Sequence, residues 1–256
     1  DPGKRPTFES IVEHLKTEKK FITKNVNEEL YRSYIKYIDE RDESQIHKFP
    51  LISLKPFYQE YQDMNEYSSG PGLFDPHIIS DMKVTDVFKG EFFTSQKLED
   101  KPNVFLSITS NFDIIFTQEE KKEVIIDISK LNEMKHPSIS KFFAFSFWNI
   151  KKEPKPIILY ECCSDRYLSE IIEKGSNDSN WNSTNKLIVI YGIASSMSYL
   201  YKNDIYNPFI NPTNILINDE YQPKLTNYFL QNRKVGFDNN ISSYYQSPEY
   251  LHSKVI

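Results

Sequence analysis

The chain has 256 residues, of which 39% are hydrophobic and 26% are charged, an ordinary composition for a globular protein with a sizeable core. Its net charge of −5 at pH 7 argues against non-specific nucleic-acid binding, which needs a basic face. No apolar run approaches the ~20 residues of a membrane-spanning helix, and the opening DPGKRPTFES lacks the apolar core of a signal peptide. We therefore expect neither a nucleic acid nor a membrane as partner.

Cysteine and glycine usage give two further expectations. The cysteines, Cys162 and Cys163, are adjacent, and the side chains of adjacent strand residues point apart, so we expect no disulfide. Reduced thiols fit a cytoplasmic location. The chain has only seven glycines, although loops that bind phosphate through backbone amides are built from glycine.

The first part of the chain predicts two helices and a linker. Apolar residues recur at helical spacing near its start: Phe8, Ile11, Val12 and Leu15. Asn27 is a suitable N-cap for a second helix that runs to about Asp39. Residues 48–76 mix proline, glycine, serine and aromatic residues, a composition typical of a linker.

Residues 79–256 predict strands followed mainly by helices. Strand-like runs are expected at residues 82–88, 91–95, 104–109, 142–147 and 157–160. A helix after the third run begins at Thr117, where Thr117 and Glu120 fit a capping box. A long helix and two short strands complete the series, at residues 184–202, 215–217 and 223–226. This order predicts an α+β fold class and by itself indicates no function.

The segment from Asn207 to Leu230, NPFINPTNILINDEYQPKLTNYFL, contains a motif in register. It resembles the catalytic loop and metal-binding loop of protein kinases, in which H-R-D-L-K-P-x-N-I-L precedes D-F-G. Pro212 and Asn214 match that pattern, and the spacing between the two loops is right. Shorter matches to the loop after helix αC, the hinge and the A-P-E motif follow in the family's order, at residues 136–139, 159–162 and 245–250. The chain is thus identified as a degenerate member of the protein kinase superfamily, most similar to the tyrosine-kinase-like group.

The resemblance implies the α+β, bilobal protein-kinase-like fold, with an antiparallel-sheet N-lobe that contains one helix and a helical C-lobe that is truncated. Residues 79–256 would form this domain, with the N-lobe at residues 79–160 and a partial C-lobe at residues 161–256.

The residues before this domain resemble a different part of the family. Residues 1–8 are similar to the segment that leads into the last helix of a kinase C-lobe. Residues 1–24 would then be the C-terminal helix of a preceding kinase-like domain, and residues 25–78 a helix plus linker. The chain would be a fragment spanning the end of one kinase-like domain and most of a second, and we expect its first helix to lack a full core.

The family's catalytic-loop and metal positions fall on unsuitable residues. Phosphoryl transfer uses a carboxylate that accepts the substrate's proton, and that position is Phe209, which cannot accept one. The metal-binding aspartate corresponds to Asn227, a neutral amide that supplies no compensating charge. The second metal ligand is kept as Asn214, although an asparagine in a turn also caps its own backbone.

The N-lobe positions are similarly altered. Ser107 occupies the position of the lysine on the third strand, whose ammonium would neutralise phosphate oxygens, and the carboxylate partner of that lysine would be Asp127 or, one turn earlier, Glu123. The glycine-rich loop is reduced to Gly90. Only hinge contacts at residues 161–163, from Glu161 to Cys163, remain for adenine. We therefore expect no cofactor: ATP binding should be weak or absent, and Mg²⁺ should bind only with ATP.

The resemblance and the losses together favour a pseudokinase, a regulatory or scaffolding module in signalling whose partner is another kinase domain or signalling protein. One alternative is a divergent active Ser/Thr kinase that uses Asp204 or Asp219 near the catalytic loop. A second alternative is a purely structural docking module whose linker binds a partner through aromatic residues: Phe57, Tyr58, Tyr61 and Tyr67.

Overall fold

A computed structural model describes most of the predicted elements. The described residues are 5–40, 73, 76, 83–89, 93–98, 105–164, 166–205 and 210–226. Contacts within the chain divide it into two units. The helical unit comprises Asp1–Asp42, His136–Ile139 and Ser164–Ile256, and the sheet unit comprises Glu43–Lys135 and Ser140–Cys163.

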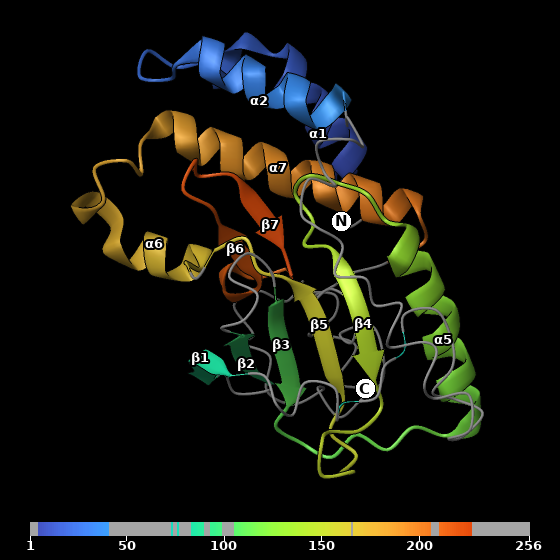
Figure 1. Ribbon diagram of the computed structural model, residues 1–256. Coiled ribbons are helices and arrows are strands. Elements are labelled where there is room, and N and C mark those ends of the chain that lie inside the picture. The colour runs from blue at the N-terminus through green and yellow to red at the C-terminus, as the bar shows by residue number, and fades with distance from the viewer. Residues whose placement is uncertain are drawn as a thin grey trace, which may run out of the picture. The chain divides into compact units, whose positions relative to one another are not determined.

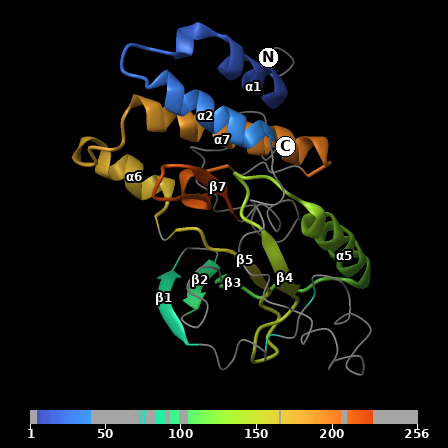
Figure 2. The same ribbon diagram turned by 45° about the horizontal axis from the view of Figure 1, so that its top comes forward.

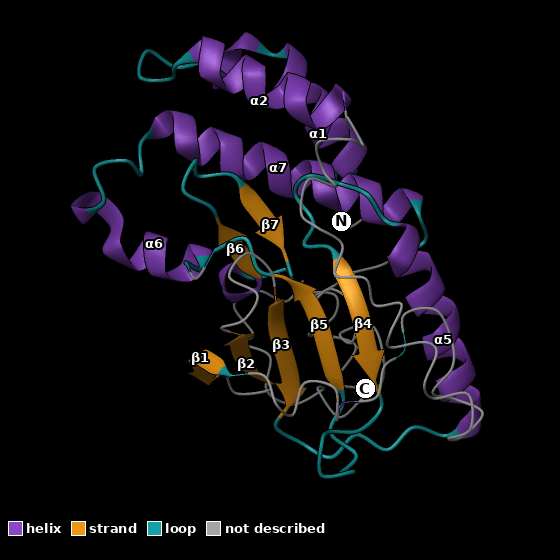
Figure 3. Cartoon of the chain, viewed as in Figure 1, coloured by secondary structure: helices purple, strands orange, loops and turns teal. Residues whose placement is uncertain are grey.

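The sheet unit contains a five-stranded antiparallel sheet in its described part, with strand order β1-β2-β3-β5-β4 (Figure 3). Its strands are β1 (Val84–Lys89), β2 (Phe93–Leu98), β3 (Phe105–Ser110), β4 (Phe142–Ser146) and β5 (Ile157–Glu161). Every residue of β5 is buried, as expected for a strand inside the sheet. The predicted sheet is therefore confirmed, including the strand expected at residues 104–109.

Helix α5 (Gln118–Glu133) is the helix expected beside this sheet. Its capping box is present: the Glu120 amide donates to Thr117 Oγ1 over 3.2 Å, and the Thr117 amide donates to Glu120 Oε2 over 2.7 Å. The helix buries an apolar stripe at helical spacing, namely Val124, Ile128 and Leu131. The capping box thus determines where the helix begins, and burial of the apolar stripe stabilises the helix.

The helical unit is built around the long helix α7 (Ser183–Lys202). Asn182 caps this helix by accepting a hydrogen bond of 3.1 Å from the Asn185 amide. The short strands β6 and β7 form an antiparallel hairpin next to it, preceded by the 3₁₀ turn η5. The remaining elements of the unit's second half are α6 (Leu168–Lys174), η4 (Gly175–Asn177), η5 (Pro212–Asn214), β6 (Ile215–Ile217) and β7 (Pro223–Leu225).

The first residues of the chain also belong to the helical unit. They form α1 (Phe8–Thr17), η2 (Lys19–Phe21) and α2 (Glu28–Glu40), and α1 and α2 lie along α7 in both views (Figures 1 and 2). Asn27 caps α2 as predicted, because its Oδ1 accepts from the Leu30 amide over 3.0 Å.

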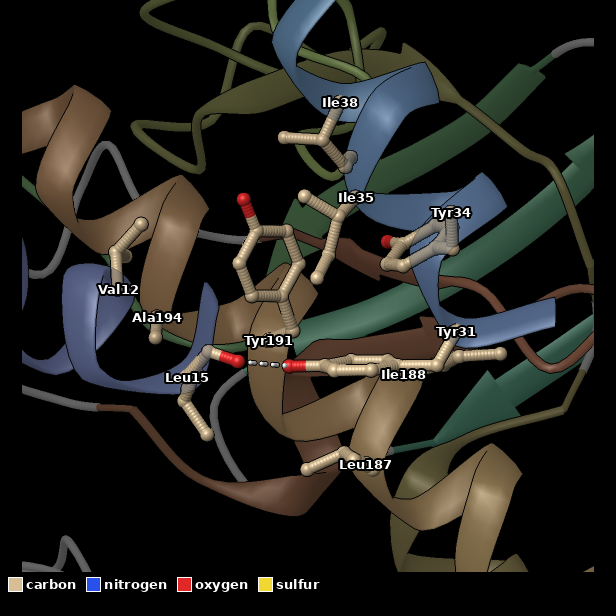
Figure 4. Packing of buried hydrophobic residues seen from close by; sticks show 10 residues of the cluster. All are labelled: Val12, Leu15, Tyr31, Tyr34, Ile35, Ile38, Leu187, Ile188, Tyr191 and Ala194. Atoms are coloured by element: carbon tan, nitrogen blue, oxygen red, sulfur yellow. Dashed lines mark hydrogen bonds between the residues drawn. The ribbon is translucent and has the colours of Figure 1, made fainter. Parts of the chain in front are cut away.

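The expectation that the first helix lacks a full core is wrong. Val12 and Leu15 are only 8% and 5% exposed. They pack with the apolar faces of α2 and α7 in one cluster, drawn in Figure 4: Val12, Leu15, Tyr31, Tyr34, Ile35, Ile38, Leu187, Ile188, Tyr191 and Ala194. The physical reason is that α7 is apolar around most of its surface and offers a face that two amphipathic helices can cover. The origin of residues 1–24 in a preceding domain stays a prediction.

None of the helices in the described ranges is long and apolar enough to cross a membrane.

Candidate functional site

Asn214 ends the 3₁₀ turn η5, directly before β6. The turn is capped by Asn211, whose Oδ1 accepts from the Thr213 amide over 2.8 Å. Asn214 is buried, and its carbonyl accepts two hydrogen bonds from Thr226, from the amide over 2.8 Å and from the hydroxyl over 3.1 Å. Thr226 directly precedes Asn227 in the sequence, and Asn227 itself lies outside the described residues. Thr226 is a residue whose contact the sequence did not reveal.

The turn between β6 and β7 is anchored by charged and aromatic residues. Tyr221 has a left-handed backbone with φ of 59°, and its hydroxyl donates to both carboxylate oxygens of Asp178, over 2.6 and 2.7 Å. The Arg166 guanidinium lies 5.3 Å from the Tyr221 ring centre. The Tyr221 hydrogen bond lowers the pKa of Asp178, whereas burial and then Asp178 raise the pKa of Tyr221. These contacts fix the far end of the hairpin.

The two aspartates proposed for an active alternative lie in turns. Asp219 is in the β6–β7 turn with a side chain 97% exposed, and Arg166 Nη2 lies 3.3 Å from its Oδ1. Asp204 follows α7 with a left-handed φ of 56°. Both positions are those of turn-forming residues, in which aspartate is common.

Ser107 lies in the middle of β3. It is paired with Gln96 on β2 and with Leu159 on β5. The strand reads FLSITS from Phe105 to Ser110, so it contains no lysine or arginine at any position. A shift of the register within this strand would therefore not restore the ammonium group.

Asp127 lies on α5 and is half-buried, whereas Glu123, one turn earlier, is exposed. The structure therefore places both candidate carboxylates on the expected helix of the sheet unit, without choosing between them.

The predicted hinge residues, 161–163, lie at the end of β5 and directly after it. Glu161 is 5% exposed, and its Oε2 accepts a hydrogen bond from the Lys141 amide over 3.2 Å. Burial lowers the pKa of Lys141, and the charge of Glu161 opposes that shift. Cys162 is buried and Cys163 is half-buried, and neither forms a disulfide bond.

Several predicted site positions lie outside the described residues: Gly90, Phe209, Asn227 and residues 245–250. Of the positions that are described, Ser107, Asp127, Glu161 and Cys163 belong to the sheet unit and Asn214 belongs to the helical unit. Within the described ranges, no group of three His, Cys, Asp or Glu side chains is arranged to hold a metal ion.

The model of the family described as protein tyrosine and serine/threonine kinase matches residues 78–253, more than half of the chain. This chain belongs to the protein kinase family. The kinase match takes in the strands of the sheet unit and the α7 to β7 segment of the helical unit, as the bilobal α+β kinase fold requires. No curated protein matches the chain.

Proposed function

We propose that this kinase domain is a pseudokinase, of the tyrosine-kinase-like type, which acts in the cytoplasm by binding a partner instead of transferring phosphate. The observation that supports this most directly is β3, because the whole strand Phe105–Ser110 lacks a lysine. Catalysis of phosphoryl transfer consists almost entirely of positioning and charge stabilisation, so loss of that ammonium removes a main contribution.

Two further catalytic positions have lost their charged residues in the sequence, which also supports a pseudokinase. The base position falls on Phe209 and the metal aspartate on Asn227. The loss of a positioned base alone costs ~10²–10⁴ in rate. We infer that ATP–Mg²⁺ is bound weakly or not at all, since the sequence supplies neither an ammonium on β3 nor a charged metal ligand at Asn227.

The framework around these positions is kept. Asn214 is buried in its turn, and Thr226 donates two hydrogen bonds to its carbonyl. A fold that is kept while its chemistry is lost fits a surface used for recognition. We infer that the partner is another kinase domain or a signalling protein, which this domain regulates or scaffolds. The active-kinase alternative has less support, because Asp204 and Asp219 both lie in turns; the aromatic linker of the docking alternative lies outside the described residues.

Micromolar ATP is expected to leave the thermal unfolding midpoint within about 1 °C of its ligand-free value, with or without Mg²⁺. A ligand at concentration L stabilises the native state by RT ln(1 + L/Kd), which is small when L is below Kd, and here most of the phosphate contacts that would lower Kd are missing. Differential scanning fluorimetry over an ATP series measures this, and Ser107→Lys is the matched variant. A Mg²⁺-dependent rise of several degrees in the unmodified protein would contradict the proposal.

Transfer of γ-phosphate by the unmodified protein, to itself or to a generic substrate, is expected to equal a no-enzyme control. The matched variant restores the three missing groups together, as Phe209→Asp, Asn227→Asp and Ser107→Lys. Transfer by the restored variant alone would support the register proposed here, because it would show that these positions carry the missing charges. Radiolabel transfer above background in the unmodified protein would show an active kinase.

A further inference from the structure

Three elements of the helical unit meet at Gly192, in the middle of α7. A Cβ atom at this position would lie 2.5 Å from Pro223 Cγ on β7 and 2.5 Å from the Tyr34 hydroxyl on α2. Such distances are too short for real contacts, so only glycine allows this approach. The end of the Tyr34 side chain and the Pro223 ring therefore both approach α7 at Gly192.

Hydrogen bonds lead from this point to the candidate site. The Tyr34 hydroxyl shares a buried hydrogen bond of 2.9 Å with Ser138 Oγ. The carbonyl of Ser138 accepts from the Leu225 amide of β7 over 2.9 Å. The next residue, Thr226, donates to the carbonyl of Asn214. Each step links an element to the next one, from α2 to the retained metal-ligand position.

The segment around Ser138 is itself held by buried polar groups. The Ser138 amide donates to His136 Nδ1 over 3.1 Å, which leaves Nε2 to carry the proton of a neutral ring. His136 Nε2 lies 3.1 Å from Ser195 Oγ on α7. The Ser138 amide is thus held through His136, which contacts α7, whereas the Ser138 hydroxyl is hydrogen-bonded to Tyr34.

The helix pair is docked through polar contacts at its ends as well as through the apolar cluster. Lys16 and Asp39 form an ion pair of 2.8 Å between α1 and α2, and the Tyr191 hydroxyl of α7 donates to Asp39 over 3.4 Å. The Asn27 amide donates to Thr184 Oγ1 at the start of α7 over 2.8 Å. Docking therefore depends on several contacts between segments that are far apart in the sequence.

We propose that the α1–α2 pair is a regulatory element built into the helical unit, and that Tyr34 is the positioning residue that couples it to the β6–β7 hairpin. When the pair is docked, Tyr34 holds Ser138 in the position in which the Ser138 carbonyl accepts a hydrogen bond from the Leu225 amide. When the pair is released, that support is lost and the hairpin with Asn214 and Thr226 opens more readily. This coupling holds whether or not the domain binds ATP, so it extends beyond the proposed function.

Hydrogen exchange of backbone amides in the full chain, followed by nuclear magnetic resonance, tests the coupling. Tyr34→Phe removes one hydroxyl and keeps the ring. We expect it to raise the exchange rates of Leu225 and Thr226 about fivefold relative to the Ile171 amide of α6, the equivalent of one ordinary hydrogen bond. The matched control is Tyr31→Phe. The hydroxyl that it removes donates to the Leu15 carbonyl over 3.0 Å, within the helix pair. It should leave that ratio unchanged.

A second variant, Ser138→Ala, removes the other partner and keeps the backbone carbonyl. Alone it should raise the same two exchange rates, and combined with Tyr34→Phe it should add little, because both changes break one interaction. A rise shared equally by all amides, an equal effect of Tyr31→Phe, fully additive effects, or no change would each overturn the proposal.

Discussion

Replacing Tyr191 by alanine is expected to lower the free energy of unfolding by about 3–5 kcal/mol, the usual cost of removing a large aromatic side chain from a core. The side chain is 0% exposed. Its ring makes edge contacts with Tyr31 and Tyr34, at centre distances of 6.0 and 6.2 Å, and such pairs contribute ~0.5–1.5 kcal/mol each beyond burial. Figure 4 shows the ring at the centre of the cluster. Urea unfolding followed by circular dichroism measures the change.

The neighbouring residue on the same helix provides the control. Ile190 is 52% exposed, so Ile190→Ala should change the free energy of unfolding by less than about 0.5 kcal/mol. If Tyr191→Ala costs no more than Ile190→Ala, then α1 and α2 are not packed on α7 in solution, and the coupling proposed through Tyr34 fails with it.

Stability is expected to fall steeply as the pH rises above 10. Burial raises the pKa of Tyr31 to about 12, with Arg32 opposing the shift. Burial is also the main cause of the raised pKa values of Tyr34 and Tyr191, and at Tyr191 the Asp39 carboxylate adds to it. In the unfolded chain these hydroxyls ionise near pH 10, whereas in the folded chain they keep their protons.

The sign and size of the effect follow from proton linkage. Below pH 10 both states hold the three protons and the contribution to stability is complete. Between pH 10 and the folded pKa values only the native state holds them, so stability is lost by about 1.4 kcal/mol per tyrosine and pH unit, or about 4 kcal/mol per pH unit for three. Urea unfolding at a series of alkaline pH values measures the slope.

One tyrosine is removed at a time to assign the slope. Tyr31→Phe should reduce it by about a third, because one of the three buried hydroxyls is gone. Comparison with the same variant at about pH 8 separates the lost hydrogen bond to Leu15, which acts at every pH, from ionisation, which acts only above about pH 10. A slope that is the same in the variant and the unmodified protein would show that Tyr31 is not buried in solution.

The elements that the sequence predicted well are those specified by neighbouring residues. The start of α5 depends on Thr117 and Glu120, and the start of α2 on Asn27, and both caps are present. Short strand-like runs likewise located the strands of the sheet, and apolar residues at helical spacing located α7. The four described site residues Ser107, Asp127, Glu161 and Asn214 lie on β3, α5, the end of β5 and η5, and their roles stay predictions.

The short helix α6 shows where local signals were too weak. Its seven residues, Leu168–Lys174, are too few for a helix that is stable by propensity alone. It is held instead by the burial of Leu168 and Ile171, which a sequence pattern of this length does not reveal.

Only the tertiary structure decided that residues 5–40 belong to the helical unit. The hydrogen bond between Tyr34 and Ser138 joins residues 104 positions apart, and the Thr226 contact with Asn214 joins a strand end to a turn. The amphipathic patterns of α1 and α2 indicate that both helices pack on an apolar surface, but they do not indicate which element of the fold provides that surface. That choice depends on the fit between side chains such as Tyr34, Gly192 and Pro223, and the fit exists only when distant segments are brought together.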